Sequence, residues 1–216
     1  MEKKKIVLYG DSIRVGYDKY VKEALENVAN VYYPLENCKF AVNVLRFAHE
    51  WKELGEWPDD IDLVHWNAGL WDALELFGDE PLTPLEVYKD YIFRVYKRLR
   101  FIYPKAKLVF ATSTAVIEEK CSPDFRRHNS IIEEYNRVAV EVLSKTDSVI
   151  NDLFSITKNC PEEYHSDCVH YYTDSGREMI GGKVLSVICK ELDIKAKDVN
   201  IKDFKPDFYS KKEIGY

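Results

Sequence analysis

Short apolar runs alternate with longer amphipathic segments along most of the chain. The first run, Ile6-Val7-Leu8-Tyr9, is apolar at every position, which is typical of a strand that is buried on both faces. Strands of this kind are expected at residues 5–9, 28–33, 62–67, 106–112 and 147–151. Between them, apolar residues recur at helical spacing, as they do from Tyr88 to Ile102, and each such set predicts one buried helical face. The alternation therefore predicts an α/β fold.

Strands that are joined by helices run parallel, because each helix carries the chain back to the same edge of the sheet. We therefore expect a three-layer α/β/α sandwich around a flavodoxin-like five-stranded parallel sheet with the order 2-1-3-4-5. In that order, ligands bind beyond the carboxyl ends of the first and third strands. Ser12 follows the first strand and Asn67 ends the third, so we expect these two residues to face one crevice.

The charge balance excludes some classes of partner. The 216 residues include 31 basic and 37 acidic side chains, with a net charge of −6, so the chain has no basic footprint for nucleic acid or an anionic membrane. No apolar segment approaches the roughly 20 residues of a membrane span. Residues 3–5 are lysines, but the apolar run that follows is too short for a signal peptide. We expect a cytoplasmic protein that acts on a small molecule.

The five cysteines form no Cys-x-x-Cys pair and are odd in number, which argues against a disulfide framework and against a zinc site. We expect reduced thiols and no metal. The chain has the length of a single α/β domain. Its last segment, residues 193–216, is rich in Lys, Asp and Tyr with little periodicity, and we interpret it as a surface extension or an oligomer arm.

A serine hydroxyl needs a neighbouring base before it can act as a nucleophile, and that base needs a group that orients it. Of the five histidines, His165 and His170 share the loop before the last predicted helix, and only His170 has an aspartate, Asp167, three residues upstream. This spacing lets the carboxylate meet the imidazole within one tight turn. A plainer interpretation stays open, in which Ser12 caps a helix and Asp167 stabilises a turn.

These segments resemble the conserved blocks of the SGNH, or GDSL-type, hydrolase superfamily. Gly10-Asp11-Ser12 is similar to the first block, Asp167-Cys168-Val169-His170 to the last, and residues 65–70 to a variant of the third. The resemblance runs from about residue 6 to residue 192 in the order expected for that fold. It implies a single SGNH-like domain over residues 1–216, with residues 193–216 as its extension.

The resemblance also implies a serine esterase without a cofactor. Ser12 would attack the ester carbonyl, His170 would take its proton, and Asp167 would orient the imidazole. The substrate would be a small acyl ester, and an O-acetyl group on a carbohydrate is one candidate.

Two of the blocks depart from the family pattern. The third is usually Gly-x-Asn-Asp, whose asparagine amide lies in the oxyanion hole, and here we expect the Asn67 amide to take that role with the Ser12 N–H. The Gly69 N–H is a further candidate donor. The second block is a glycine after strand two, which this chain lacks. We expect Asn37 to replace it in the oxyanion hole, because asparagine tolerates a left-handed backbone.

Three residues are candidates for contact with the substrate. Arg14 lies two positions after the nucleophile, where a guanidinium suits a carboxylate or phosphate, although a solvated arginine is an equal alternative. Trp66 and Trp71 flank Asn67, and aromatic faces suit sugar rings, but such residues are also common in cores and crevice walls.

Two other function classes stay open. A binding protein that keeps the fold without catalysis is suggested by the altered second and third blocks, and it would place the Ser12 hydroxyl beyond reach of His170. Phosphoryl chemistry at Asp11 ranks last, because the chain lacks the supporting lysine and Mg²⁺-site patterns.

Overall fold

The computed structural model describes residues 2–202 and 204. A five-stranded parallel sheet with the order β2-β1-β3-β5-β7 forms its centre. The strands are β1 (Lys4–Tyr9), β2 (Ala29–Tyr32), β3 (Leu63–Trp66), β5 (Lys107–Ala111) and β7 (Val149–Asn151). The predicted sheet and strand order are thereby confirmed, with strand ends that differ by one or two residues.

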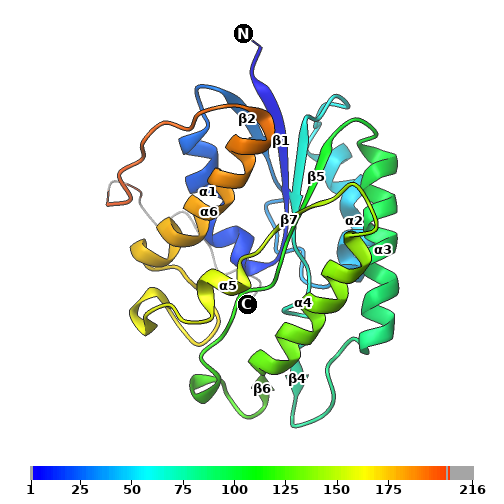
Figure 1. Ribbon diagram of the computed structural model, residues 1–216, viewed down its shortest axis with the longest axis vertical. Coiled ribbons are helices and arrows are strands. Elements are labelled where there is room, and N and C mark those ends of the chain that lie inside the picture. The colour runs from blue at the N-terminus through cyan, green and yellow to red at the C-terminus, as the bar shows by residue number, and fades with distance from the viewer. Residues whose placement is uncertain (1, 203, 205–216) are drawn as a thin grey trace.

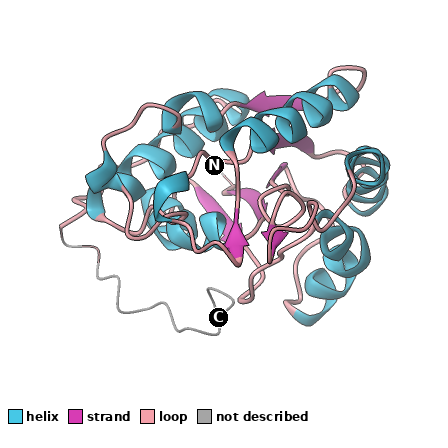
Figure 2. Cartoon of the chain, turned by 90° about the horizontal axis from the view of Figure 1, so that it is seen from below, coloured by secondary structure: helices cyan, strands magenta, loops and turns pink. Residues whose placement is uncertain are grey.

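Helices cover both faces of the sheet (Figure 1). On one face α1 (Ser12–Ala24) packs against α6 (Asp174–Leu192), and on the other α3 (Leu85–Ile102) packs between α2 (Ala41–Leu54) and α4 (Asn129–Leu143). Figure 2 looks toward the carboxyl ends of the strands and shows the sheet between its two helical layers. The three-layer sandwich that the periodicity predicts is confirmed.

The sheet is buried because its strands are apolar on both faces. Ile6, Val7, Leu8 and Tyr9 of β1 are 0% exposed. The polar end of Tyr9 is satisfied, since its hydroxyl donates to the Ala48 carbonyl at 2.8 Å. This buried strand delivers the next residues, Gly10 to Ser12, to the carboxyl edge of the sheet.

Short elements complete the fold. An antiparallel pair joins β4 (Glu75–Leu76) to β6 (Phe125–Arg126), and α5 is a single turn (Phe154–Thr157). Two 3₁₀ turns, η1 (Glu118–Lys120) and η2 (Glu162–Tyr164), lie in the loops before α4 and α6. The sequence pattern does not predict the β4–β6 pair, because two residues are too few to show a period.

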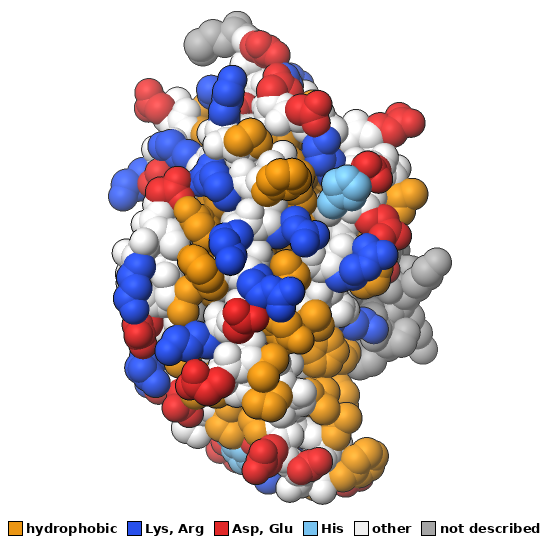
Figure 3. Space-filling view, turned by 90° about the vertical axis from the view of Figure 1, so that its right-hand side faces the viewer, with side chains coloured by type: hydrophobic (Ala, Val, Ile, Leu, Met, Phe, Trp, Pro, Cys, Tyr) orange, Lys and Arg blue, Asp and Glu red, His pale blue; other side chains and the backbone are white. Residues whose placement is uncertain are grey.

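The outer face of α2 and α3 mixes hydrophobic side chains with lysines and arginines (Figure 3). Phe93 and Phe101 are 42% and 84% exposed. The Lys97 ammonium lies 4.7 Å from the Phe93 ring centre, so part of this apolar surface is covered by cations. Across residues 2–202 and 204, none of the helices combines the length and the apolarity that crossing a bilayer requires.

The first part of the predicted C-terminal extension packs on α1. Asp193 ends α6 with a left-handed φ of 52°. The Lys197 N–H then donates to the Ala24 carbonyl at 2.8 Å, and the Phe204 ring lies 6.0 Å from that of Tyr20. The remainder of the extension, 203 and 205–216, lies outside the described residues.

Candidate active site

The junction of β1 and α1 presents Ser12 at a helix N-terminus. Asp11 is the N-cap of α1, and its Oδ1 accepts the Ile13 N–H at 2.9 Å. Ser12 is the first residue of the helix and is 5% exposed. The local sequence thus stops the strand, caps the helix and fixes the position of the serine hydroxyl.

Ser12, His170 and Asp167 form one hydrogen-bonded chain. His170 Nε2 lies 2.8 Å from Ser12 Oγ, and His170 Nδ1 lies 2.7 Å from Asp167 Oδ2. The other carboxylate oxygen, Asp167 Oδ1, accepts the N–H groups of Val169 and His170 at 2.7 and 2.8 Å. One tight turn therefore places the carboxylate against the imidazole, as the three-residue spacing predicts.

The charge of Asp167 is set by its neighbours. Burial by itself raises the pKa of this carboxyl group, but the hydrogen bond and charge of His170, with the two backbone N–H donors, lower the pKa to about 2. Asp167 is therefore ionised at neutral pH. Its negative charge keeps the imidazole proton on Nδ1 and leaves Nε2 as an acceptor for the Ser12 hydroxyl.

Asn67 lies across the turn that carries the nucleophile. It directly follows β3, is 3% exposed, and its backbone N–H donates to the Tyr9 carbonyl at 3.2 Å. Burial raises the pKa of the neighbouring Asp11 carboxyl group, and the Asn67 side chain opposes this shift. A Cβ on Gly10 would lie 2.0 Å from Asn67 Oδ1, so the glycine is what lets this amide approach.

Gly69 and Asp72 hold the loop that follows Asn67 in place. Gly69 has a φ of +145°, and a Cβ there would lie 2.5 Å from Ser113 Oγ. Asp72 Oδ2 accepts the Ala41 N–H at 3.0 Å and so ties this loop to the start of α2.

The expectation that Asn37 adopts the left-handed backbone of the second-block glycine is wrong. In the β2–α2 loop that conformation belongs to Lys39, whose φ is 53°. Asn37 is buried and its Oδ1 accepts the Lys39 N–H at 2.8 Å, so it supports the turn with its side chain. The same loop meets the nucleophile turn where the Cys38 N–H donates to the Gly10 carbonyl at 3.1 Å.

Arg14 is not placed to contact a substrate, which corrects the expected role. It is 1% exposed, and its Nη1 lies 2.5 Å from Asp18 Oδ2 and 2.9 Å from the Pro34 carbonyl. Helical spacing puts Asp18 one turn below Arg14, and the β2–α2 loop covers both. The guanidinium therefore joins α1 to that loop.

The two tryptophans beside Asn67 have different environments. Trp66 is 0% exposed and packs edge-on against Phe110 at 4.7 Å, so it belongs to the core and its expected contact with substrate is corrected. Trp71 is half-buried. It lies 5.6 Å from the Phe40 ring, and the Lys39 ammonium lies 5.3 Å from the Trp71 ring centre. Of the two, only Trp71 is available to line a crevice.

Tyr172 is a site residue that the sequence reasoning missed. Its ring stacks on the His170 imidazole with 4.8 Å between the ring centres, and its hydroxyl donates to the Ser12 carbonyl at 2.6 Å. A tyrosine two residues after the candidate base was the available signal.

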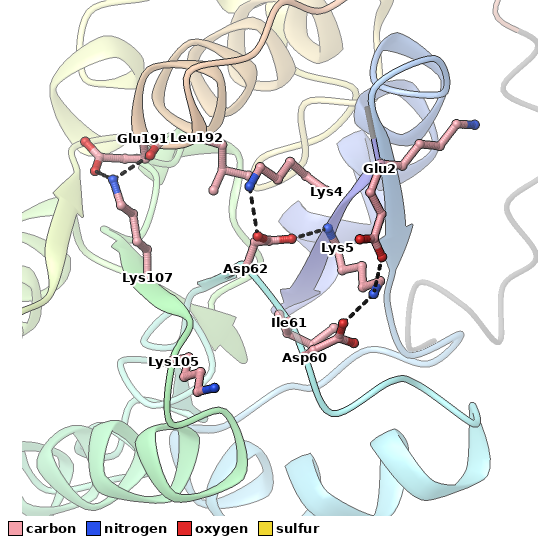
Figure 4. Close-up of a pocket in the computed structure, with 11 residues that line it drawn as sticks. Glu2, Lys4, Lys5, Asp60, Ile61, Asp62, Lys105, Lys107, Glu191 and Leu192 are labelled. Atoms are coloured by element: carbon pink, nitrogen blue, oxygen red, sulfur yellow. Dashed lines mark hydrogen bonds and ion pairs between the residues drawn. The ribbon is translucent and has the colours of Figure 1, made fainter.

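A hollow of about 460 Å³ lies at the opposite edge of the sheet, at the amino ends of the strands (Figure 4). Lysines and carboxylates line it, and they pair with one another, as in Lys4 with Asp62 at 3.1 Å and Lys107 with Glu191 at 3.2 Å. The hollow contains none of the residues of the Ser12 site.

Comparisons with known proteins agree on the architecture. No protein-family model matches the sequence, and no curated protein matches it. Among solved structures, a lipase/acylhydrolase from Enterococcus faecalis is 21% identical with a TM-score of 0.67, and the alignment covers 91% of this chain and 100% of that one. A GDSL-like lipase from Bacteroides thetaiotaomicron is 15% identical with a TM-score of 0.64, covering 87% and 88%.

An acetyl xylan esterase is also similar, at 18% identity and a TM-score of 0.62, with 85% of this chain and 99% of that one covered. Sequence identities of this size show that the folds are similar. The chain therefore has the fold of the GDSL-like lipases and acylhydrolases.

Proposed function

We propose that this protein is a serine esterase that hydrolyses a small acyl ester through Ser12, His170 and Asp167. The observation that supports the proposal is the continuous chain of hydrogen bonds from Ser12 Oγ to His170 at 2.8 Å and on to Asp167 at 2.7 Å. A nucleophile, a base and an orienting carboxylate are the parts that acyl transfer by serine requires. The fold shared with lipases and acylhydrolases supports the same class of reaction.

In the first half of the reaction, Ser12 Oγ attacks the ester carbonyl carbon while its proton passes to His170 Nε2. The Asp167 carboxylate stabilises the imidazolium that forms. The carbonyl oxygen becomes an oxyanion, which we assign to the Ser12 N–H and the Asn67 amide, with the Gly69 N–H as a further donor. Collapse of this oxyanion breaks the bond from the carbon to the alcohol oxygen, which takes the proton from His170, so the alcohol leaves and Ser12 Oγ stays acylated.

In the second half, His170 takes a proton from water, and the resulting hydroxide attacks the acyl carbon. Collapse of this second oxyanion breaks the bond to Ser12 Oγ, which recovers its proton from His170. The products are one alcohol and one carboxylic acid.

For the substrate we propose a short acyl ester, with an O-acetyl group on a carbohydrate as the first class to examine. Trp71 supports this choice, because its half-buried ring lies in the loop after β3, four residues after Asn67. The acetyl xylan esterase among the similar structures points to the same class.

The test is hydrolysis of p-nitrophenyl acetate and butyrate by the purified protein and by Ser12→Ala. A serine-directed phosphonate is added in parallel, and the modified peptide is identified by mass. We expect turnover that is abolished by the substitution and by the phosphonate, with the adduct on the Ser12 peptide. Asp90→Asn, at an exposed position on α3, is the control and should keep full turnover.

Wild-type turnover in Ser12→Ala would overturn the assignment of the nucleophile. Absence of both turnover and adduct in the wild-type protein would instead favour a binding protein with this fold. If turnover depends on Ser12, the next substrates to test are acetylated xylan oligosaccharides, with acetate release as the measurement.

A further inference from the structure

Tyr172 contacts both ends of the hydrogen bond between Ser12 and His170. Its ring stacks on the imidazole, with ring centres 4.8 Å apart and planes at 28°. Its hydroxyl donates to the Ser12 backbone carbonyl at 2.6 Å. One side chain therefore touches the base and the backbone of the nucleophile.

This double contact bridges two distant parts of the chain. Ser12 belongs to α1 near the N-terminus, whereas His170 lies in the loop before α6, and 158 residues separate them. Building on the proposed esterase function, we propose that Tyr172 is a positioning residue that keeps the His170 imidazole against the Ser12 hydroxyl. It takes part in no proton transfer and acts through His170.

The surroundings of Tyr172 are built to seat its ring. Gly16 lies one turn after Ser12 in α1, and a Cβ there would lie 2.5 Å from Tyr172 Cε1. The Arg177 guanidinium lies over the ring, 5.8 Å from its centre, and the Tyr172 N–H donates to Ser166 Oγ at 3.3 Å. The ring is thus held against His170 by three features: the absence of a side chain at Gly16, the Arg177 cation and the hydrogen bond of the Tyr172 N–H.

The stacked ring limits rotation of the imidazole, and the hydroxyl fixes the distance between the loop and α1. Without these contacts, His170 Nε2 would spend less time pointing at Ser12 Oγ. Misplacing a base slows the chemical step, whereas substrate affinity depends on other groups. A loss in kcat at nearly constant KM is therefore the signature that separates positioning from substrate binding.

The first test compares Tyr172→Phe and Tyr172→Ala with Tyr171→Phe on p-nitrophenyl acetate. Tyr171 is the matched control, because its hydroxyl also donates to a backbone carbonyl, that of Ala115 at 2.9 Å, without contact to the Ser12–His170 bond. We expect kcat to fall about fivefold in Tyr172→Phe, which corresponds to the net free energy of one hydrogen bond. In Tyr172→Ala we expect kcat to fall on the order of 100-fold. KM should change less than about twofold.

A second arm displaces the ring without altering Tyr172. At an exposed helix position, a change from glycine to alanine stabilises the helix, because alanine has the higher helix propensity. In Gly16→Ala, however, the new Cβ would displace the Tyr172 ring from its position against α1. We expect kcat to fall while KM stays. Gly182→Ala in α6, where a Cβ meets nothing within 4 Å, is the control and should leave kcat unchanged.

A readout that needs no substrate is the low-field NMR signal of the proton between His170 Nδ1 and Asp167. We expect the signal to shift or broaden in Tyr172→Ala and Gly16→Ala but to persist in Tyr171→Phe. Wild-type kcat and an unchanged signal in Tyr172→Ala would overturn the inference. An equal loss in Tyr171→Phe, matched by an equal loss of thermal stability, would do the same.

The proposed function and the role of Tyr172 can fail independently of each other. If the wild-type protein neither turns over esters nor forms the Ser12 adduct, the esterase is wrong, and the NMR signal alone then decides whether Tyr172 orients His170.

Discussion

Ser12 Oγ lies 2.8 Å from His170 Nε2, although 158 residues separate the two in the chain. The contact forms because β1 ends at the carboxyl edge of the sheet and the loop before α6 returns to that edge. The pair is therefore a product of topology as much as of residue type. Its dependence on neighbouring groups can be tested one group at a time.

Asp167→Asn should reduce kcat by up to about 10⁴-fold while leaving the fold intact. The asparagine Oδ1 can still accept the N–H groups of Val169 and His170, which preserves the turn. Its amide, however, would face His170 Nδ1 with a donor, and the imidazole would then carry its proton on Nε2 and could not serve as a base. The measurement is kcat on p-nitrophenyl acetate beside a thermal melt. Unchanged kcat would remove Asp167 from the mechanism.

Asn67→Ala should lower kcat by about 10²–10³, as expected for the loss of one oxyanion donor, with little effect on KM. Asn151→Ala is a matched control, because Asn151 is also buried and its Nδ2 hydrogen bonds to His65 at 3.1 Å, away from Ser12. Both changes should cost stability, but only the first should slow the reaction at a temperature where both proteins are folded. Full activity of Asn67→Ala would assign the oxyanion to backbone donors alone.

Arg14→Met should destabilise the protein by about 3–5 kcal/mol, because it leaves the Asp18 carboxylate buried without its partner. Arg46→Met removes a pair with the same helical spacing, Arg46 with Glu50 at 2.9 Å, but on the exposed surface, and should cost about 0.3–0.5 kcal/mol. Urea unfolding measures both. KM for p-nitrophenyl acetate should be unaltered by Arg14→Met, and a large rise in KM would restore the substrate contact that its burial argues against.

Asp72 makes the stability of the protein depend on pH. Burial raises the pKa of this carboxyl group from 3.8 to about 6, so between these values the folded state binds more protons than the unfolded state. The contribution of Asp72 is fully present below pH 3.8 and is lost as the pH rises through 6. Burial also raises the pKa of Asp18 to about 6, against the opposing effect of Arg14, so Asp18 changes the free energy of unfolding with pH in the same direction.

Asp72→Asn should therefore flatten the fall in the free energy of unfolding between pH 4 and 6, by up to about 1.4 kcal/mol per pH unit. Urea titrations at half-unit pH steps compare the variant with the wild-type protein. Identical slopes would mean that the Asp72 carboxyl group keeps its ordinary pKa in the folded protein.

Much of the fold was predictable from local patterns. The apolar runs at β1, β3 and β5 and the helical spacing in α3, α4 and α6 require no knowledge of the rest of the chain, because strand and helix periods are local properties. The strand order followed from the usual topology of parallel sheets. The pairing of β4 with β6 did not, since two-residue strands about 50 positions apart leave no period to read.

For the candidate site, the sequence by itself determined which groups are available: a serine after a buried strand and an Asp-x-x-His turn before the last helix. The tertiary structure decided which of the other candidates face the site. Arg14 and Trp66 are turned inward, Lys39 takes the left-handed backbone expected at Asn37, and Tyr172 stacks on His170. Residue type and spacing fix what a side chain can do, but burial and contact depend on segments that meet only when the chain folds.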